Sequence, residues 1–159
     1  MISTRERLLL LISALCFGAL GVALISQHVY DMPPCAWCVF QRLLYLGVGV
    51  AALIGAVTGG VAARIEGMLA AMLSAGGIVA AWYQYTVAAK MLSCDQTFAD
   101  RFMVSTGLDA AVPWLFGIYA TCMDAVVHVL GVEYALWSLA LFALLLALSL
   151  VAALRRYPA

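Results

Sequence analysis

The chain has 159 residues, of which 67% are hydrophobic and only 10% are charged. A soluble domain carries about 25% charged residues, so this composition excludes an ordinary soluble protein and predicts an integral membrane protein. The formal net charge is zero, so no overall positive field attracts nucleic acid, and no such partner is expected. A chain of this length forms one domain, and we expect it to cover residues 1–159.

Four long apolar segments follow one another along the chain. Each is long enough to cross a hydrocarbon core about 30 Å thick as a helix. They cover residues 8–26, 37–57, 67–89 and 134–154, and Arg42 is the only charged residue inside any of them. Lipid offers the backbone no hydrogen-bond partners, so membrane-spanning segments of this kind are helices. The predicted fold class is therefore all-α, an integral membrane four-helix bundle.

Basic residues mark one side of this bundle. They precede the first segment, lie in the link between the second and third, and follow the fourth: Arg5, Arg7, Arg64, Arg155 and Arg156. Basic residues in short loops favour the cytoplasmic side, so we expect both termini there. The outer loops are then residues 27–36 and a long second loop, 90–133. Residues 112–119 of that loop are apolar and aromatic, and they form either a short helix at the membrane surface or a loop packed on the bundle.

Four of the five cysteines fall on the outer side. Cys35 and Cys38 form a C-x-x-C at the outer end of the second segment, a motif used for either redox or metal chemistry. Pro34 suits the first position of a helix, which places both cysteines in its first turn. Unpaired N–H groups and the positive end of the helix dipole favour a thiolate there, and a thiolate attacks disulfides.

Arg42 follows Cys38 by four residues and Cys35 by seven, so the three side chains are predicted to share one helix face. An arginine inside a membrane costs about 2.5–3.5 kcal/mol on insertion scales. One interpretation is that Arg42 stabilises a thiolate or a polarised carbonyl oxygen. The alternative is that its side chain only reaches out to the lipid headgroups.

The remaining cysteines are interpreted by their position. Cys94 and Cys122 lie in the long outer loop, where a disulfide is the default in an oxidising compartment. That disulfide is either a static brace, worth about 3–4 kcal/mol, or an exchangeable one that meets a partner. Cys16 lies within the first segment and is expected to pack as a small apolar residue against another helix.

These motifs together resemble a known family. A Gln27-His28-Val29 sequence precedes the run from Pro34 to Arg42, and a long outer loop with two cysteines follows. This arrangement is similar to the bacterial disulfide bond formation proteins of the DsbB family. The resemblance implies a thiol oxidoreductase of the bacterial inner membrane, with its redox cysteines facing the periplasm. It would reoxidise a periplasmic DsbA-like dithiol protein and pass the electrons to a membrane quinone, either ubiquinone or menaquinone.

The resemblance also implies a role for each outer cysteine. Cys94 would form the mixed disulfide with the partner and would pair with Cys122. Electrons would then pass to the Cys35–Cys38 pair, in which Cys38 contacts the quinone.

Three further residues would form the quinone site by the same resemblance. Arg42 would be its arginine, and Gln27 matches a glutamine near it. Tyr85 falls where family members carry a histidine, so we expect this site to bind quinone without an imidazole. His28 is expected to be a surface or interface residue rather than a catalyst.

A function of another class is also compatible with the cysteines. The four outer cysteines could form a closed Cys₄ site in a structural or metal-binding bundle. Against this, structural zinc sites use two tight cysteine pairs, whereas Cys94 and Cys122 are far apart in the sequence. The zinc content of the purified protein separates the two functions.

Overall fold

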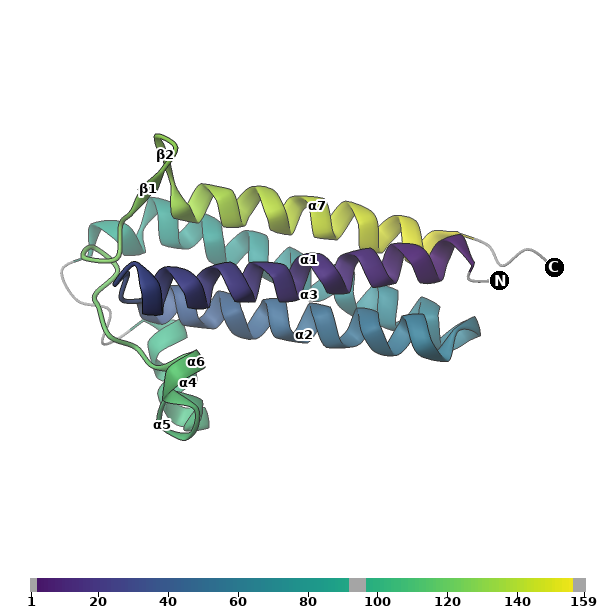
Figure 1. Cartoon of the computed structure of the whole chain (residues 1–159), viewed down its shortest axis with the longest axis horizontal. Helices are drawn as coiled ribbons and strands as arrows, with labels where there is room; N and C mark the ends of the chain where they lie inside the picture. Colours follow the sequence, from purple (N-terminus) through teal and green to yellow (C-terminus); the bar gives the residue numbers. More distant parts are fainter. Residues whose placement is uncertain (1–2, 92–96, 156–159) are drawn as a thin grey trace.

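The computed structural model describes residues 3–91 and 97–155. Four long helices lie side by side and form a bundle (Figure 1). They are α1 (Thr4–Val29), α2 (Ala36–Thr58), α3 (Gly60–Thr86) and α7 (Tyr134–Leu154). Each is long and apolar enough to cross a membrane, so the protein is an all-α, multi-pass membrane bundle, as the sequence predicts.

Local sequence signals explain where the first and third helices begin. Ser3 and Glu6 form a capping box, because the Glu6 N–H donates to the Ser3 hydroxyl and the Ser3 N–H donates to the Glu6 carboxylate. Gly59 and Gly60 have φ values of +66° and +56°, which glycine adopts without a Cβ clash. They make so tight a turn that Arg64, expected in the link, lies inside α3.

Small residues allow the helices to approach one another closely. A Cβ added at Gly77 of α3 would overlap the Phe142 ring of α7, so only glycine fits there. At the contact between α1 and α2, a Cβ added at Gly49 would lie 3.1 Å from the Cβ of Cys16. Cys16 is fully buried in this contact, which confirms the prediction that it packs as a small apolar residue.

The connection between α3 and α7 carries more regular structure than the sequence predicts. Its described elements are η1 (Ala88–Lys90), α4 (Phe98–Thr106), α5 (Leu108–Ala111), α6 (Pro113–Phe116), β1 (His128–Val129) and β2 (Val132–Glu133). The two short strands pair antiparallel, with His128 opposite Glu133. Helices α4 to α6 lie to one side of the bundle, toward the end opposite the termini (Figure 1).

The apolar segment 112–119 packs on the bundle with one side only. Phe116 of α6 is buried together with Met103 of α4 and Val39 of α2. Trp114, two residues earlier, is 57% exposed. The segment is therefore a short helix held on α2 through Phe116, with Trp114 directed outward.

Candidate functional site

The α3–α7 connection is fastened over the start of α2. The carbonyl of Pro34 accepts hydrogen bonds from the backbone N–H groups of Tyr119 (3.0 Å) and Ala120 (3.3 Å). The N-cap of α2 is Cys35, so Pro34 lies just before the helix. The prediction that Pro34 takes the first helical position is wrong. The same contacts bring Cys122 into a buried cluster with Cys35, and the two side chains are hydrogen-bonded.

Cys35 and Cys38 are adjacent thiols at the start of α2. Their Sγ atoms are 3.0 Å apart, and the backbone N–H of Cys38 donates to the Sγ of Cys35 at 3.4 Å. A helix N–H therefore reaches the sulfur, as predicted. Two features of the structure oppose the expected preference of Cys35 for the thiolate. Its contact with the Cys122 thiol and its complete burial raise the pKa of Cys35, and the hydrogen bonds from Cys38 offset this only in part.

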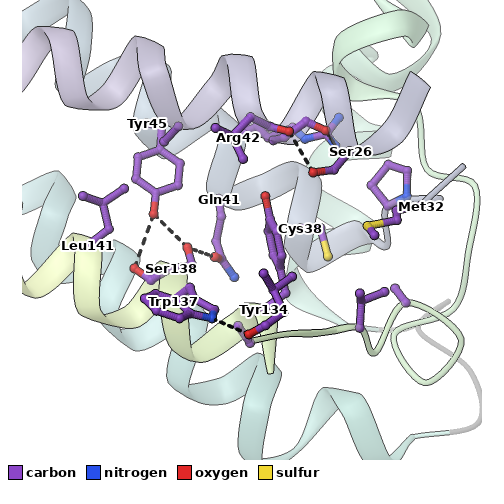
Figure 2. A pocket seen from close by; sticks show the side chains of 18 of the residues that line it. Ser26, Met32, Cys38, Gln41, Arg42, Tyr45, Tyr134, Trp137, Ser138 and Leu141 are labelled. Atoms are coloured by element: carbon purple, nitrogen blue, oxygen red, sulfur yellow. Dashed lines mark hydrogen bonds between the residues drawn. The ribbon is translucent and has the colours of Figure 1, made fainter. Parts of the chain in front are cut away.

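A cavity of about 620 Å³ lies beside Cys38, within the range typical of ligand pockets. Most of its walls come from α1, α2 and α7, and we call it the bundle cavity. Its deep end is apolar and is lined by Ala14 and Gly18 of α1 and Leu141 of α7. Polar side chains extend along its wall from the start of α2, among them Arg42, Gln41, Ser138 and Tyr45 (Figure 2).

Cys38 and Arg42 both line the bundle cavity, whereas Cys35 does not. The predicted common face is therefore correct for the pair at spacing i, i+4 and wrong for Cys35. The reason is local. Cys35 has the extended backbone of an N-cap residue, with φ −87° and ψ 171°, so helical spacing does not govern its direction. Its side chain packs with Cys122 instead.

Arg42 is buried and is held by three neutral oxygens. Its Nη1 donates to Oε1 of Gln27 at 2.5 Å and to the Leu115 carbonyl at 3.0 Å, and its Nη2 donates to the Ala23 carbonyl at 3.3 Å. The side chain is only 5% exposed, so the alternative in which it reaches out to headgroups is wrong. None of these acceptors is charged, and the positive charge is therefore available to an anion or a polarised oxygen in the cavity.

The other two residues predicted for the cofactor site lie off the cavity wall. Gln27 does not line the bundle cavity but orients Arg42. Tyr85 is half-buried, its ring contacts Trp82, and it is absent from the cavity wall. Successive helical residues are rotated by about 100°, and the preceding residue, Gln84, is the one that lines the cavity. The geometry thus puts Gln84 in the place expected for Tyr85.

His28 has a bonding role at the edge of this region. Its Nε2 lies 3.1 Å from the carbonyl oxygen of Trp114, which ties α1 to α6. This agrees with the expectation of an interface residue.

Sequence reasoning missed four polar residues of the site: Gln41, Tyr45, Gln84 and Ser138. All four line the bundle cavity and form one chain of hydrogen bonds that ends at Cys38. The signal was present in the sequence. Carboxamides and hydroxyls within membrane-spanning helices need partners inside the protein, as charges do.

Cys94 lies outside the described residues, so its predicted pairing with Cys122 stays a prediction. Within residues 3–91 and 97–155, no group of three or more His, Cys, Asp or Glu side chains is arranged to hold a metal ion. The alternative Cys₄ site requires Cys94 and is addressed by measurement below.

Comparison with known proteins identifies the family. The family model described as "Disulfide bond formation protein DsbB" matches residues 5–152. Disulfide bond formation protein B of Ralstonia nicotianae is 34% identical over 149 residues, covering 92% of each chain. That of Marinobacter nauticus is 31% identical over 156 residues, covering 92% of this chain and 90% of the relative. Disulfide bond formation protein B 2 of Pseudomonas aeruginosa is 37% identical over 132 residues, covering 77% and 75%. The chain therefore belongs to the DsbB family, and it is a multi-pass membrane oxidoreductase of disulfide bond formation.

Proposed function

We propose that this protein reoxidises a periplasmic DsbA-like dithiol protein and passes the two electrons to a quinone of the bacterial inner membrane. The observation that carries the proposal is the position of Cys38. Its thiol lines a large, mostly apolar cavity that also contains the buried cation of Arg42. An apolar cavity with a few placed polar groups suits an apolar ring that carries carbonyl oxygens.

The orientation follows from charge. Arg5 and Arg155 lie together at one end of the bundle, since the Arg5 guanidinium donates to the Arg155 carbonyl. The cysteine cluster lies at the start of α2, toward the opposite end (Figure 1). The positive-inside rule assigns the arginine end to the cytoplasm and the Cys35 end to the periplasm.

The first exchange takes place at the loop pair. A thiolate of the partner attacks the Cys94–Cys122 disulfide at Cys94, which gives a mixed disulfide and releases Cys122. The second partner thiolate then attacks its own mixed disulfide and releases Cys94. The partner leaves as a disulfide, and the loop pair holds two electrons and two protons as thiols.

The second exchange transfers these electrons to α2. The Cys122 thiolate attacks Cys35 of the Cys35–Cys38 disulfide and releases Cys38. Cys94 then attacks Cys122, which re-forms the loop disulfide and frees Cys35. The contact between the Cys122 and Cys35 side chains supports this route, because exchange requires the attacking sulfur to reach its target.

The last step uses the bundle cavity. Quinone, when bound, accepts two electrons and two protons and leaves as quinol. Cys38 and Cys35 supply both, and a disulfide forms between their sulfurs. Arg42 would place its positive charge near a bound carbonyl oxygen and stabilise the negative charge gained there, an interaction that is strong where water is excluded. Ala14, Gly18 and Leu141 would hold the apolar tail.

Filling the apolar end of the cavity is expected to weaken binding of long-tailed quinone. Gly18 lines the cavity, and a Cβ added there meets no atom within 4 Å. We expect Gly18→Leu to raise KM for a quinone with a long isoprenoid tail by about tenfold, because the added side chain occupies the tail's space. KM for a short-tailed analogue should change little. Gly21→Leu is the matched control, since Gly21 is equally open but does not line the cavity.

The proposal is tested by quinone reduction with two electron donors. The wild type in detergent should reduce quinone with a DsbA-like protein in its dithiol form. Cys122→Ser should lose this activity, yet keep activity with a small dithiol that reduces Cys35–Cys38 directly. Full activity of Cys122→Ser with the protein dithiol would make the loop pair a static brace. A wild type that reduces no quinone and contains one zinc per chain would favour the Cys₄ alternative.

A further inference from the structure

A buried chain of hydrogen bonds joins three of the membrane-spanning helices and ends at the reacting sulfur. The Tyr45 hydroxyl lies 2.8 Å from Oγ of Ser138, and Ser138 donates to Oε1 of Gln41 at 2.5 Å. Nε2 of Gln41 donates to Oε1 of Gln84 at 2.6 Å. Nε2 of Gln84 then donates to Sγ of Cys38 at 3.2 Å. Figure 2 shows the part of the chain from Tyr45 through Ser138 to Gln41 along one side of the bundle cavity.

All the donors in this chain point the same way. The single hydroxyl proton of Ser138 goes to Gln41, so the Tyr45 hydroxyl is the donor to Ser138, at 2.8 Å to its Oγ and 3.3 Å to its carbonyl oxygen. Each carboxamide accepts through its oxygen and donates through its nitrogen. Gln41 therefore fixes which end of the Gln84 amide faces Cys38. That end carries N–H groups, which are donors only.

The chain lies where hydrogen bonds are strongest. Gln41 and Gln84 are 5% and 8% exposed, at positions within membrane-spanning helices. In such surroundings an unpaired amide is costly and linked hydrogen bonds strengthen one another. A neutral thiol is a weak acceptor, whereas a thiolate accepts a strong, charge-assisted bond. The last donor of the chain thus favours the charged form of the sulfur.

We propose that Gln84 acts directly on Cys38, by stabilising its thiolate while electrons leave for the quinone, and that Gln41, Ser138 and Tyr45 are positioning residues that hold Gln84 in its donating orientation. This inference rests on the proposed function. In this proposal two residues stabilise the Cys38 thiolate in different ways. Arg42, which is bonded to α1 and α6, supplies positive charge, and Gln84 of α3 supplies a directed hydrogen bond.

The test is the reactivity of Cys38 in the reduced protein without added quinone. Iodoacetamide alkylates thiolates, and tandem mass spectrometry separates Cys38 from Cys35. Gln84→Met removes the donor but keeps most of the volume. We expect alkylation of Cys38 at pH 7 to slow about tenfold and the midpoint of its pH profile to move up by about one unit, because the thiolate loses a charge-assisted bond.

Ser138, which lies further along the hydrogen-bond chain from Cys38, supplies an independent pair of variants. Ser138→Ala should shift the profile in the same direction by a smaller amount, about twofold to threefold in rate, through misorientation of Gln41 and Gln84. Ser138→Thr keeps the hydroxyl and should restore the wild-type profile. Thr86→Val is the matched control on α3, since the Thr86 hydroxyl bonds to the Trp82 carbonyl of its own helix.

Two results would overturn the inference. One is a folded Gln84→Met protein with the wild-type alkylation profile, which would make the chain a brace between helices. The other result applies if Gln84→Met does not fold: equal alkylation profiles for Ser138→Ala and Ser138→Thr would then reject the inference. Because alkylation is measured without quinone, it is separable from the proposed function. If the variants change the alkylation profile of Cys38 as expected but the wild type never reduces quinone, only the proposed function is rejected.

Discussion

Cys38→Ser is expected to abolish quinone reduction with every thiol donor, with turnover falling at least about a thousandfold. A serine hydroxyl neither forms a disulfide nor ionises near neutral pH, so the variant has no thiol on the cavity wall to release electrons. Cys35 cannot replace it, because Cys35 is completely buried, does not line the cavity and packs with Cys122. The loss of quinone absorbance measures the effect.

The control for this variant is Cys16→Ala. Cys16 is a buried thiol at the contact of α1 with α2, next to Gly49 and off the cavity wall, so turnover should stay near the wild-type value. If Cys35→Ser loses turnover while Cys38→Ser keeps it, the two cysteines have the opposite roles to those proposed.

Arg42→Met is expected to raise KM for quinone by about 10- to 100-fold, the range given by loss of a hydrogen bond to a charged group. Methionine keeps much of the apolar stem but removes the cation and its donors. Gln27, Leu115 and Ala23 would lose their shared donor as well, so the cavity wall would also lose its fixed shape.

Arg42→Lys distinguishes charge from geometry. Lysine keeps the charge, but an ammonium cannot reproduce the fork that reaches both α1 and α6, so we expect an intermediate KM. Arg64→Met is the control, because Arg64 is an exposed cation at the other end of α3 from Gln84. An unchanged KM in Arg42→Met would mean that Arg42 only fastens α6 to α1.

The sequence predicts the bundle well because each membrane-spanning helix satisfies its own backbone and needs only length and hydropathy. The first helix was expected from residue 8 but begins at Thr4, because the Ser3–Glu6 capping box that starts it was not considered. Helix α4 and the β1–β2 hairpin were missed. They are short, and α4 is held through tertiary contacts such as that of Met103 with Val39, which no local pattern reveals.

The site was predictable in its chemistry but not in its contacts. The C-x-x-C and Arg42 stand out in the sequence, and the structure puts Cys38 and Arg42 on one cavity. The contact of Cys35 with Cys122 depends on how the connection folds over α2. The choice of Gln84 over Tyr85 depends on the rotation of α3 about its axis. Neither is encoded in a local pattern.

The most direct test is an anaerobic assay in which a DsbA-like protein in its dithiol form is mixed with the wild-type protein and quinone. The account predicts one quinol formed for each dithiol oxidised, since each disulfide formed releases two electrons and two protons. Oxidation of the dithiol without quinol, or no reaction with either ubiquinone or menaquinone, would contradict it.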